Sequence, residues 1–183
     1  MKYRTLFHML SCKLKEAGIP PVLIGGYAVN AHKVTRQTLD VDLLMTEDDY
    51  RRLLPPLRHA GCEEVLHGRL FARIRHPALS LMEVDMVFVD GKTRDGVVKE
   101  GKEVELEGEK FFVPSLNHLF ALKLHAMKQN IRRRGFRDLQ DILDLANANG
   151  VDIEKPEFRD LFLKYGPQEI YEEILGLVKK WKN

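Results

Sequence analysis

Asp40 and Asp42 are spaced so that two carboxylates can act together. They stand in the segment LDVDLLM (39–45), where acidic residues alternate with apolar ones before the run becomes fully apolar, a pattern that predicts a strand. Residues two apart on a strand share a face, roughly 6.5 Å apart along the backbone, so the two like charges repel each other. A divalent cation between them removes this repulsion, and Mg²⁺ prefers hard oxygen ligands. The pair therefore predicts a magnesium site.

Asp85 supplies a third carboxylate in a second strand-like segment, MEVDMVFV (82–89). If this strand pairs beside the first, the three carboxylates suit two metal ions about 4 Å apart, which activate an attacking hydroxyl and neutralise a leaving phosphate. Glu83 shares the strand face, but the flank of Asp85 is more apolar. Asp90 stands before Gly91 at the strand end, where aspartate is an ordinary turn residue.

Gly25 and Gly26 close the apolar run IPPVLI (19–24), which predicts a buried strand leading into a tight turn. Glycines let a phosphate approach the backbone amides at the start of the next helix, which we expect at 27–33. Alone, Asp-x-Asp is more often an exposed alternating face, and Gly-Gly is more often a simple turn. Their order along the chain, with Arg-x-Thr before the acidic pair and an Asp in a later strand, is difficult to obtain from folding needs alone.

The remaining elements follow from periodicity and from glycine and proline positions. Residues 1–18 and 47–60 have helical composition, strand signals fill 63–113 with a hairpin turn at EGEK, and the chain is helical from 115 onward. We predict an α/β part at residues 1–114 and a C-terminal helical region at residues 115–183.

The composition limits the class of protein. A hydrophobic content of 44% is enough to bury a core, and 29 basic against 27 acidic residues leave any nucleic-acid site local. Cys12 and Cys62 lack metal or disulfide spacing, which favours a reducing compartment. The first helix lacks the continuous apolar stretch of a signal peptide, and no run reaches about 18 apolar residues, so we expect a soluble cytoplasmic protein without a membrane partner. The motifs GxxxxGK[ST], HExxH and GxSxG are absent from the sequence.

The Gly-Gly turn, the Asp-x-Asp strand and the later Asp resemble the nucleotidyltransferase superfamily, and within it the minimal members that include the AbiEii-type toxin proteins. The resemblance implies an α+β fold: a polymerase-β-like palm with a mixed, mostly antiparallel sheet flanked by helices, followed by a C-terminal helical region. It implies phosphate contacts at Gly25 and Gly26 and metal ligands at Asp40, Asp42 and Asp85. Asp85 is then the general base by position.

Further nucleotide-binding residues are assigned from the same resemblance. Arg36 and Thr38 precede the acidic pair in its motif. The segment LKLHA (122–126) resembles the K-x-x-A helix of the AbiEii-like members, in which Lys123 would bind the triphosphate. A lysine among leucines also commonly extends its amine to water, which is the simpler interpretation.

The segment RDLQD (137–141) resembles the K-D-x-x-D element of the same members, with Arg137 in place of lysine. Asp138 and Asp141 would then orient the triphosphate or act near the acceptor. Equally, these carboxylates and the nearby Arg134 and Arg137 form a solvated face of ion pairs. For the dense basic stretch KQNIRRRGFR (128–137), a solvated loop is favoured over a site for RNA or nucleotide phosphate.

These observations lead to one main hypothesis and two alternatives. The main hypothesis is transfer of a nucleoside monophosphate from a magnesium-bound nucleoside triphosphate, ATP or another, to a hydroxyl of RNA, protein or a small molecule, with release of pyrophosphate. An alternative is a catalytically silent nucleotide-binding or partner-binding module, against which the complete set Asp40, Asp42 and Asp85 argues. A third hypothesis is a toxin controlled by an antitoxin-like partner.

Overall fold

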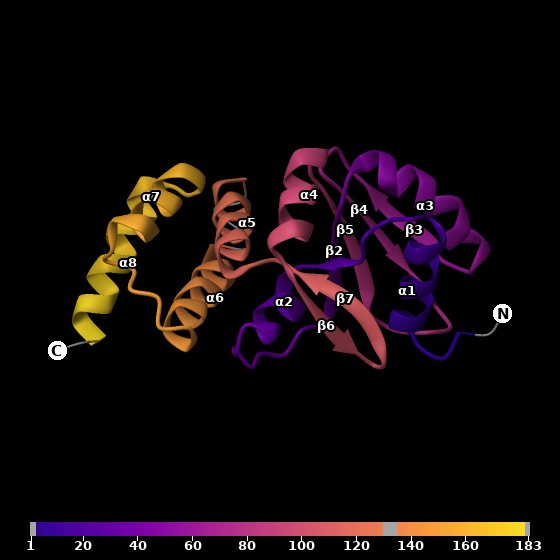
Figure 1. The fold of residues 1–183 in the computed structure, drawn as a ribbon, viewed down its shortest axis with the longest axis horizontal. Coiled ribbons are helices and arrows are strands. Elements are labelled where there is room, and N and C mark those ends of the chain that lie inside the picture. Colours follow the sequence, from indigo (N-terminus) through magenta and orange to yellow (C-terminus); the bar gives the residue numbers. More distant parts are fainter. Residues whose placement is uncertain (1–2, 130–134, 182–183) are drawn as a thin grey trace. The chain divides into compact units, whose positions relative to one another are not determined.

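The chain folds into two compact units, which a computed structural model describes over residues 3–129 and 135–181 (Figure 1). The first, here called the sheet unit, comprises residues 1–31 and 36–115. The second, the helical unit, comprises residues 32–35 and 116–183. None of the helices in the described ranges combines the length and the apolar character needed to cross a membrane.

The sheet unit is built on a mixed sheet of seven strands within the described residues, in the order β3-β4-β5-β2-β1-β7-β6. Four neighbouring pairs are antiparallel, whereas β1–β7 and β2–β5 are parallel. The predicted mixed, mostly antiparallel sheet is confirmed. The strands are β1 Val22–Leu23, β2 Asp40–Met45, β3 Glu63–His67, β4 Phe71–Arg75, β5 Glu83–Phe88, β6 Lys102–Leu106 and β7 Glu109–Val113.

Strands β2 and β5 lie side by side in parallel, in a register that places Asp42 opposite Asp85. Side chains alternate between the two faces of a strand, so Val41 and Val84 point to the other face, where both are fully buried. The apolar positions of the two strands therefore anchor them in the core, and this anchoring fixes the positions of the acidic residues between them.

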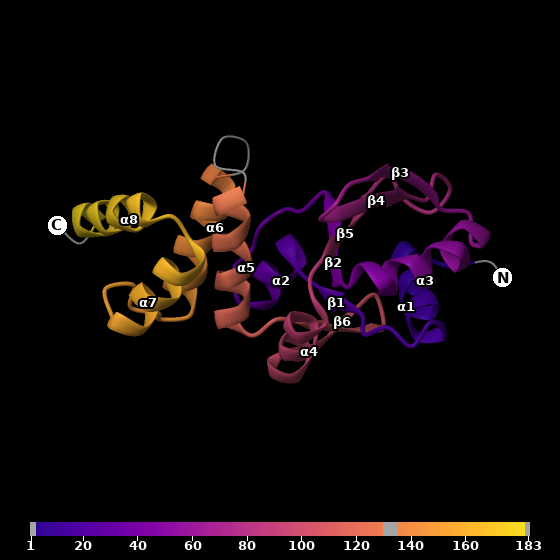
Figure 2. The same ribbon diagram turned by 90° about the horizontal axis from the view of Figure 1, so that it is seen from above.

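Three of the four helices described in the sheet unit begin at side-chain caps. Thr5 accepts a hydrogen bond from the backbone N–H of His8 at 3.2 Å, and Thr46 and Asp49 form a reciprocal capping box at the next long helix. Figure 2 shows α1 and α3 next to each other, and the two helices are in contact. The helices are α1 Leu6–Glu16, α2 Gly25–Ala31, α3 Glu47–His59 and α4 Gly91–Glu100.

Helix α4 corrects the sequence-based expectation of continuous strand structure after β5. Asp90 is its N-cap, accepting from the backbone N–H of Thr93 at 2.9 Å, and Val97 is its one fully buried side chain. Two glycines and a pair of valines weaken the helical signal of this segment, whereas the cap and the packing of Val97 determine the structure. The predicted hairpin after it is confirmed, with Glu107 and Gly108 at positive φ between β6 and β7.

Four helices form the helical unit within the described residues. Helix α5 contacts α6 and α7, and α7 contacts α8. Phe120 meets Phe158 edge-on with ring centroids 5.2 Å apart, and Phe162 and Tyr171 extend this aromatic core. The helices are α5 Leu116–Gln129, α6 Gly135–Ala148, α7 Pro156–Tyr165 and α8 Gln168–Trp181.

Candidate active site

Asp40, Asp42 and Asp85 form a carboxylate cluster at the N-terminal ends of β2 and β5. One oxygen of each residue lies within 4.8 Å of the other two. Two carboxylates at such a distance repel each other by roughly 3 kcal/mol at an effective dielectric constant of about 20. Asp85 is buried, while Asp40 and Asp42 are half-buried. The structure thus brings together the three residues that the sequence predicted as metal ligands.

Gly25 and Gly26 lie against this cluster. The backbone N–H of Ile24 donates to the carbonyl of Asp42 at 2.9 Å, which holds the glycine turn beside β2. Gly25 has a φ of 58°, and a Cβ built on it would lie 1.9 Å from Asp42 Oδ2. A side chain at Gly25 would therefore displace the Asp42 carboxylate, and this contact is a structural reason for glycine beside any role in phosphate binding.

Arg36 and Thr38 surround the second glycine. A Cβ built on Gly26 would meet Thr38 Oγ1 at 2.5 Å and Arg36 Nη2 at 3.1 Å. The Thr38 hydroxyl also lies within hydrogen-bonding distance of the carboxylate of Asp40, at 3.2 Å, and of its carbonyl, at 3.1 Å. Thr38 thus contacts the acidic cluster, and Arg36 lies beside the neighbouring glycine.

Arg73 is a member of the cluster that the sequence analysis missed. It lies on β4 directly opposite Asp85 and donates to both carboxylate oxygens, from Nε at 2.6 Å and from Nη2 at 2.8 Å. Its Nη1 lies 2.8 Å from Glu83. The hydrogen bonds to Asp85 raise the pKa of Arg73, so the guanidinium stays charged and orients that carboxylate. The alternation of FARIR places Arg73 on one face of its strand, but the cross-strand partner depends on a register that one sequence does not give.

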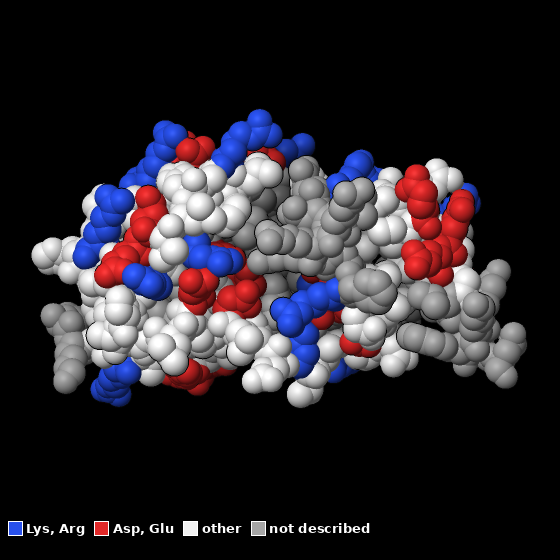
Figure 3. Space-filling model, turned by 180° about the vertical axis from the view of Figure 1, so that it is seen from behind, with Lys and Arg blue, Asp and Glu red and all other residues white. Residues whose placement is uncertain are grey.

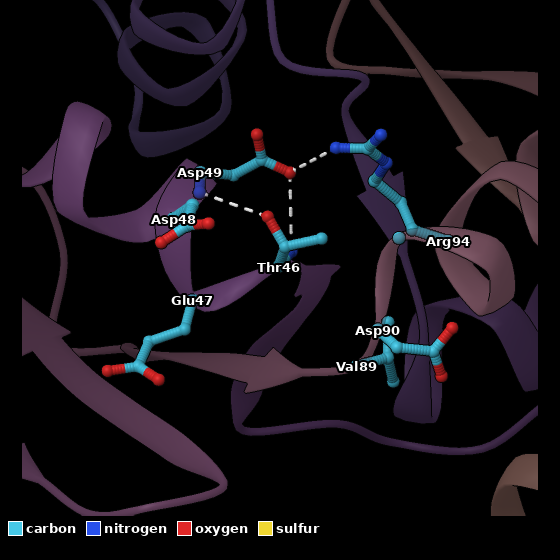
Figure 4. A pocket seen from close by; sticks show the side chains of 8 residues that line it. Thr46, Glu47, Asp48, Asp49, Val89, Asp90 and Arg94 are labelled. Carbon is cyan, nitrogen blue, oxygen red and sulfur yellow. Dashed lines mark hydrogen bonds and ion pairs between the residues drawn. The ribbon is translucent and has the colours of Figure 1, made fainter.

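The opposite end of the β2–β5 pair carries a different charged group. A pocket there is lined by Thr46, Glu47, Asp48, Asp49, Val89, Asp90, Gly91 and Arg94. In Figure 4 the carboxylate of Asp49 faces Arg94 and Thr46, and it also binds Arg52. Burial alone would raise the pKa of Asp49, but the hydrogen bonds from Arg94, Thr46 and Arg52 lower it. This carboxylate joins α3 to α4.

Lys123, Asp138 and Asp141 meet within the helical unit. Lys123 Nζ lies 2.6 Å from an oxygen of Asp141 and 3.1 Å from one of Asp138. Lys123 and Asp141 are both buried, so the pair links α5 to α6 in a region of low water access. The lysine thus does not simply extend to water.

The basic stretch at 128–137 falls largely outside the described residues, and this includes Arg134. Its described members Lys128 and Arg137 are exposed. On the face drawn in Figure 3, acidic and basic side chains lie interspersed over the sheet unit, in keeping with a formal net charge of +2.

The cluster offers a donor set that fits magnesium. Aspartate oxygens are the ligands that Mg²⁺ prefers, and three residues supply them from adjacent strands. Arg73 uses one lone pair on each oxygen of Asp85 and leaves a second available. The arrangement can therefore hold divalent cations against the phosphates of a nucleotide.

Comparisons with solved structures show which fold this is. The antibiotic-resistance factor ANT(2'')-Ia, in a crystal structure with adenylyl-2''-tobramycin, matches with a TM-score of 0.63 and 14% identity over 87% of this chain and 94% of that chain. The solution structure of ANT(2'')-Ia matches with a TM-score of 0.64 and 13% identity, over 94% of this chain and 95% of that chain. An antigenic nucleotidyltransferase-like protein from Paracoccidioides brasiliensis matches with a TM-score of 0.51 and 19% identity, over 86% of this chain and 89% of that chain.

These likenesses confirm the predicted nucleotidyltransferase fold. No match is found among curated protein sequences. The family model described as nucleotidyl transferase AbiEii toxin, type IV toxin–antitoxin system, matches residues 4–174, nearly the whole chain. The chain therefore belongs to the AbiEii nucleotidyltransferase toxin family.

Proposed function

We propose that this protein transfers a nucleoside monophosphate from a nucleoside triphosphate to a hydroxyl acceptor, with two magnesium ions held by Asp40, Asp42 and Asp85. The observation that carries the proposal is the convergence of three carboxylates within 4.8 Å in a chain of a nucleotidyltransferase family. Such a cluster is costly for folding and becomes favourable when cations occupy it. Bound magnesium would neutralise phosphate charge and lower the pKa of the attacking hydroxyl.

The residues around the cluster have distinct tasks in this proposal. Gly25 and Gly26 let the triphosphate approach the backbone, and Arg36 and Thr38 lie beside the second glycine, close to Asp40. Arg73 holds the Asp85 carboxylate in one orientation through two hydrogen bonds.

The transfer itself makes one bond and breaks one. The acceptor oxygen bonds to the α-phosphorus, the bond from that phosphorus to the oxygen bridging to the β-phosphate breaks, and pyrophosphate leaves. Asp85 takes the acceptor proton as general base. Positioning and charge neutralisation supply most of the rate, as in other phosphoryl transfers.

The helical unit contributes Lys123, Asp138 and Asp141 in the same proposal. Lys123 is held by the two carboxylates in the structure. By resemblance to the AbiEii-like members, Lys123 is proposed to bind the triphosphate, and Asp138 and Asp141 are proposed to orient the triphosphate or to act near the acceptor.

Membership of a toxin family gives the reaction its proposed setting. The acceptor is a cytoplasmic RNA, protein or small molecule whose modification stops growth, and an antitoxin-like partner limits the activity. Growth arrest on expression of the native chain, relieved by Asp40→Asn/Asp42→Asn, is the expected result in cells. Copurification from the source organism tests for the partner.

Calorimetric titration with ATP, GTP, CTP and UTP, with and without magnesium, tests the proposal. At least one triphosphate should bind the native chain only with magnesium, and Asp40→Asn/Asp42→Asn should weaken that binding at least about 100-fold, or roughly 2.7 kcal/mol. Glu47→Gln, at the opposite end of β2, is the matched control and should bind like the native chain.

Two results would count against the enzyme. If the native chain binds no triphosphate, a catalytically silent module is the better description. If the double variant binds normally, the metal site lies elsewhere. Circular dichroism should show a folded double variant, because removing two neighbouring like charges relieves repulsion. α-Phosphate-labelled triphosphate then identifies the acceptor among RNA, protein and small molecules.

A further inference from the structure

Cys12, His8 and Glu109 lie in line on the sheet unit, in residues that the nucleotidyltransferase site does not use. His8 Nδ1 is 2.6 Å from Oε1 of Glu109, and His8 Nε2 is 3.9 Å from Sγ of Cys12. His8 and Cys12 are four residues apart on α1 and so share a helix face, whereas Glu109 comes from β7.

The hydrogen bond to Glu109 places a proton on Nδ1 of His8, because an ionised carboxylate only accepts hydrogen bonds. In the neutral imidazole, Nε2 then has the lone pair, and this nitrogen faces the thiol. Hydrogen bonds from His8 and Ser11 lower the pKa of Glu109, which keeps it ionised. The histidine is thereby oriented to accept the thiol proton.

Packing in the core holds the three residues in place. Phe7, next to His8 on α1, meets Phe111 of β7 edge-on with ring centroids 5.7 Å apart, and both are buried. This contact fixes the spacing between the helix that carries the thiol and the strand that carries Glu109. A geometry held by a core contact is reproducible, as a reactive site requires.

The second cysteine provides a natural contrast. Cys62 is buried, and burial raises the pKa of its thiol to about 11. Cys12 is partly exposed. Cys12 is therefore the thiol that a reagent in water can reach.

We propose that Cys12, His8 and Glu109 form a second reactive site, in which Cys12 is a nucleophilic thiol open to covalent modification by soft electrophiles. With iodoacetamide, Sγ of Cys12 forms a bond to the methylene carbon, the carbon–iodine bond breaks and iodide leaves. The thiol proton passes to Nε2 of His8 and then to water. Glu109 acts as a positioning residue, because its carboxylate binds His8 and Ser11 rather than the thiol.

The test is the rate of iodoacetamide alkylation at each cysteine, followed by peptide mass spectrometry on the full-length chain. Cys12 should react faster in the folded chain than in the same chain unfolded by guanidinium chloride. His8→Gln and Glu109→Gln should slow Cys12 about tenfold. Lys15→Gln, an exposed change on the same helix, should leave the rate unchanged.

Cys62 reports folding in the same experiment, because it should stay unlabelled in any variant that keeps its core. A slower Cys12 with a protected Cys62 in His8→Gln supports the site. The proposal is overturned if Cys12 reacts no faster in the folded than in the unfolded chain, or if His8→Gln leaves its rate unchanged. If His8→Gln exposes Cys62, the variant is not properly folded. The proposal is then decided by whether Cys12 of the native chain is alkylated faster in the folded than in the unfolded state.

Discussion

Carboxylates lie near both ends of the parallel strands β2 and β5, and the two ends differ in what surrounds those carboxylates. At the C-terminal end, hydrogen-bond donors from Arg52, Arg94 and Thr46 converge on one buried aspartate, Asp49. At the N-terminal end, carboxylates converge on one another, with three within 4.8 Å. At the first end the donors satisfy one carboxylate, whereas at the second end three carboxylates share one guanidinium, that of Arg73, which binds Asp85.

The surroundings of a carboxylate distinguish a structural group from a binding site more clearly than the number of acidic residues does. The pocket lined by Glu47, Asp48 and Asp90 is also rich in acids, yet its buried member already has its partners (Figure 4). Donors placed around a carboxylate stabilise the fold as it stands. Carboxylates placed around one another are stabilised by an added cation.

Removing the guanidinium from the acidic end should have the largest effect on stability. Arg73→Gln leaves Asp85 buried without its bidentate partner, so we expect a loss of about 2–3 kcal/mol in the free energy of unfolding. Magnesium at about 10 mM should restore part of this loss, because a ligand that binds the folded state stabilises it. Urea unfolding with and without magnesium measures both effects.

Arg75→Gln is the matched control for that change. Arg75 lies on the same strand and pairs with Glu63, but both side chains are more than half exposed. Such a surface pair contributes about 0.5 kcal/mol or less. If Arg73→Gln is no less stable than Arg75→Gln, the guanidinium does not hold Asp85 in the way described.

Removing the Asp49 carboxylate at the other end should lower the free energy of unfolding slightly less. Magnesium should not restore this loss. Asp49→Asn deprives Arg94 of its buried partner and weakens the α3 capping box, so we expect a loss of about 2 kcal/mol. Asp48→Asn, an exposed change in the same helical turn, should cost only a few tenths of a kcal/mol. Restoration of Asp49→Asn by magnesium would contradict the contrast between the two ends.

Exchanging one glycine at each end sharpens the comparison further. Gly25→Ala forces a side chain into a left-handed backbone position and against Asp42, so it should lose about 1–2 kcal/mol of stability together with magnesium-dependent nucleotide binding. Gly91→Ala starts α4 where a Cβ meets nothing within 4 Å, and it should be neutral or slightly stabilising. Thermal unfolding and calorimetry of the two variants test this, and equal behaviour would exclude the close contact at Gly25.

The pH dependence of stability should show the smallest effect. The pKa of Asp49 is lower in the folded chain than in the unfolded chain, so its contribution is complete above the unfolded value, about 3.9, and is lost as pH falls through the folded value. The stability difference between the native chain and Asp49→Asn should thus be constant from about pH 7 to 5 and shrink below about pH 4. If the stability difference instead grows as the pH falls, the pKa of Asp49 is raised in the folded chain and not lowered.

The sequence identifies the three clustered carboxylates better than it predicts the structure that supports them. The alternation of acidic and apolar residues within a strand indicates Asp40 and Asp42, and the same pattern indicates Asp85. Their meeting depends on the parallel pairing of β2 with β5, which the spacing alone did not give; the resemblance implied only that the third carboxylate lies on a neighbouring strand. Local patterns thus identify candidate ligands, and topology brings them together.

Arg73 and α4 show where prediction from one sequence stops. The partner of Arg73 is set by strand register, which depends on contacts between distant segments. In α4, weak helix formers are held by the Asp90 cap and by burial of Val97, so tertiary packing overrides local preference. The Lys123 ion pairs likewise required the packing of α5 on α6.

Paramagnetic broadening by Mn²⁺ in ¹⁵N-edited NMR spectra tests the central claim most directly, because it reads both ends of the strand pair in one experiment. Small additions of Mn²⁺ should first broaden the amide signals of Gly25, Asp42 and Asp85, and excess Mg²⁺ should restore them, while Asp49 stays sharp. Early broadening around Asp49 and Asp90, or none at the cluster, would contradict the assignment of the metal site to Asp40, Asp42 and Asp85.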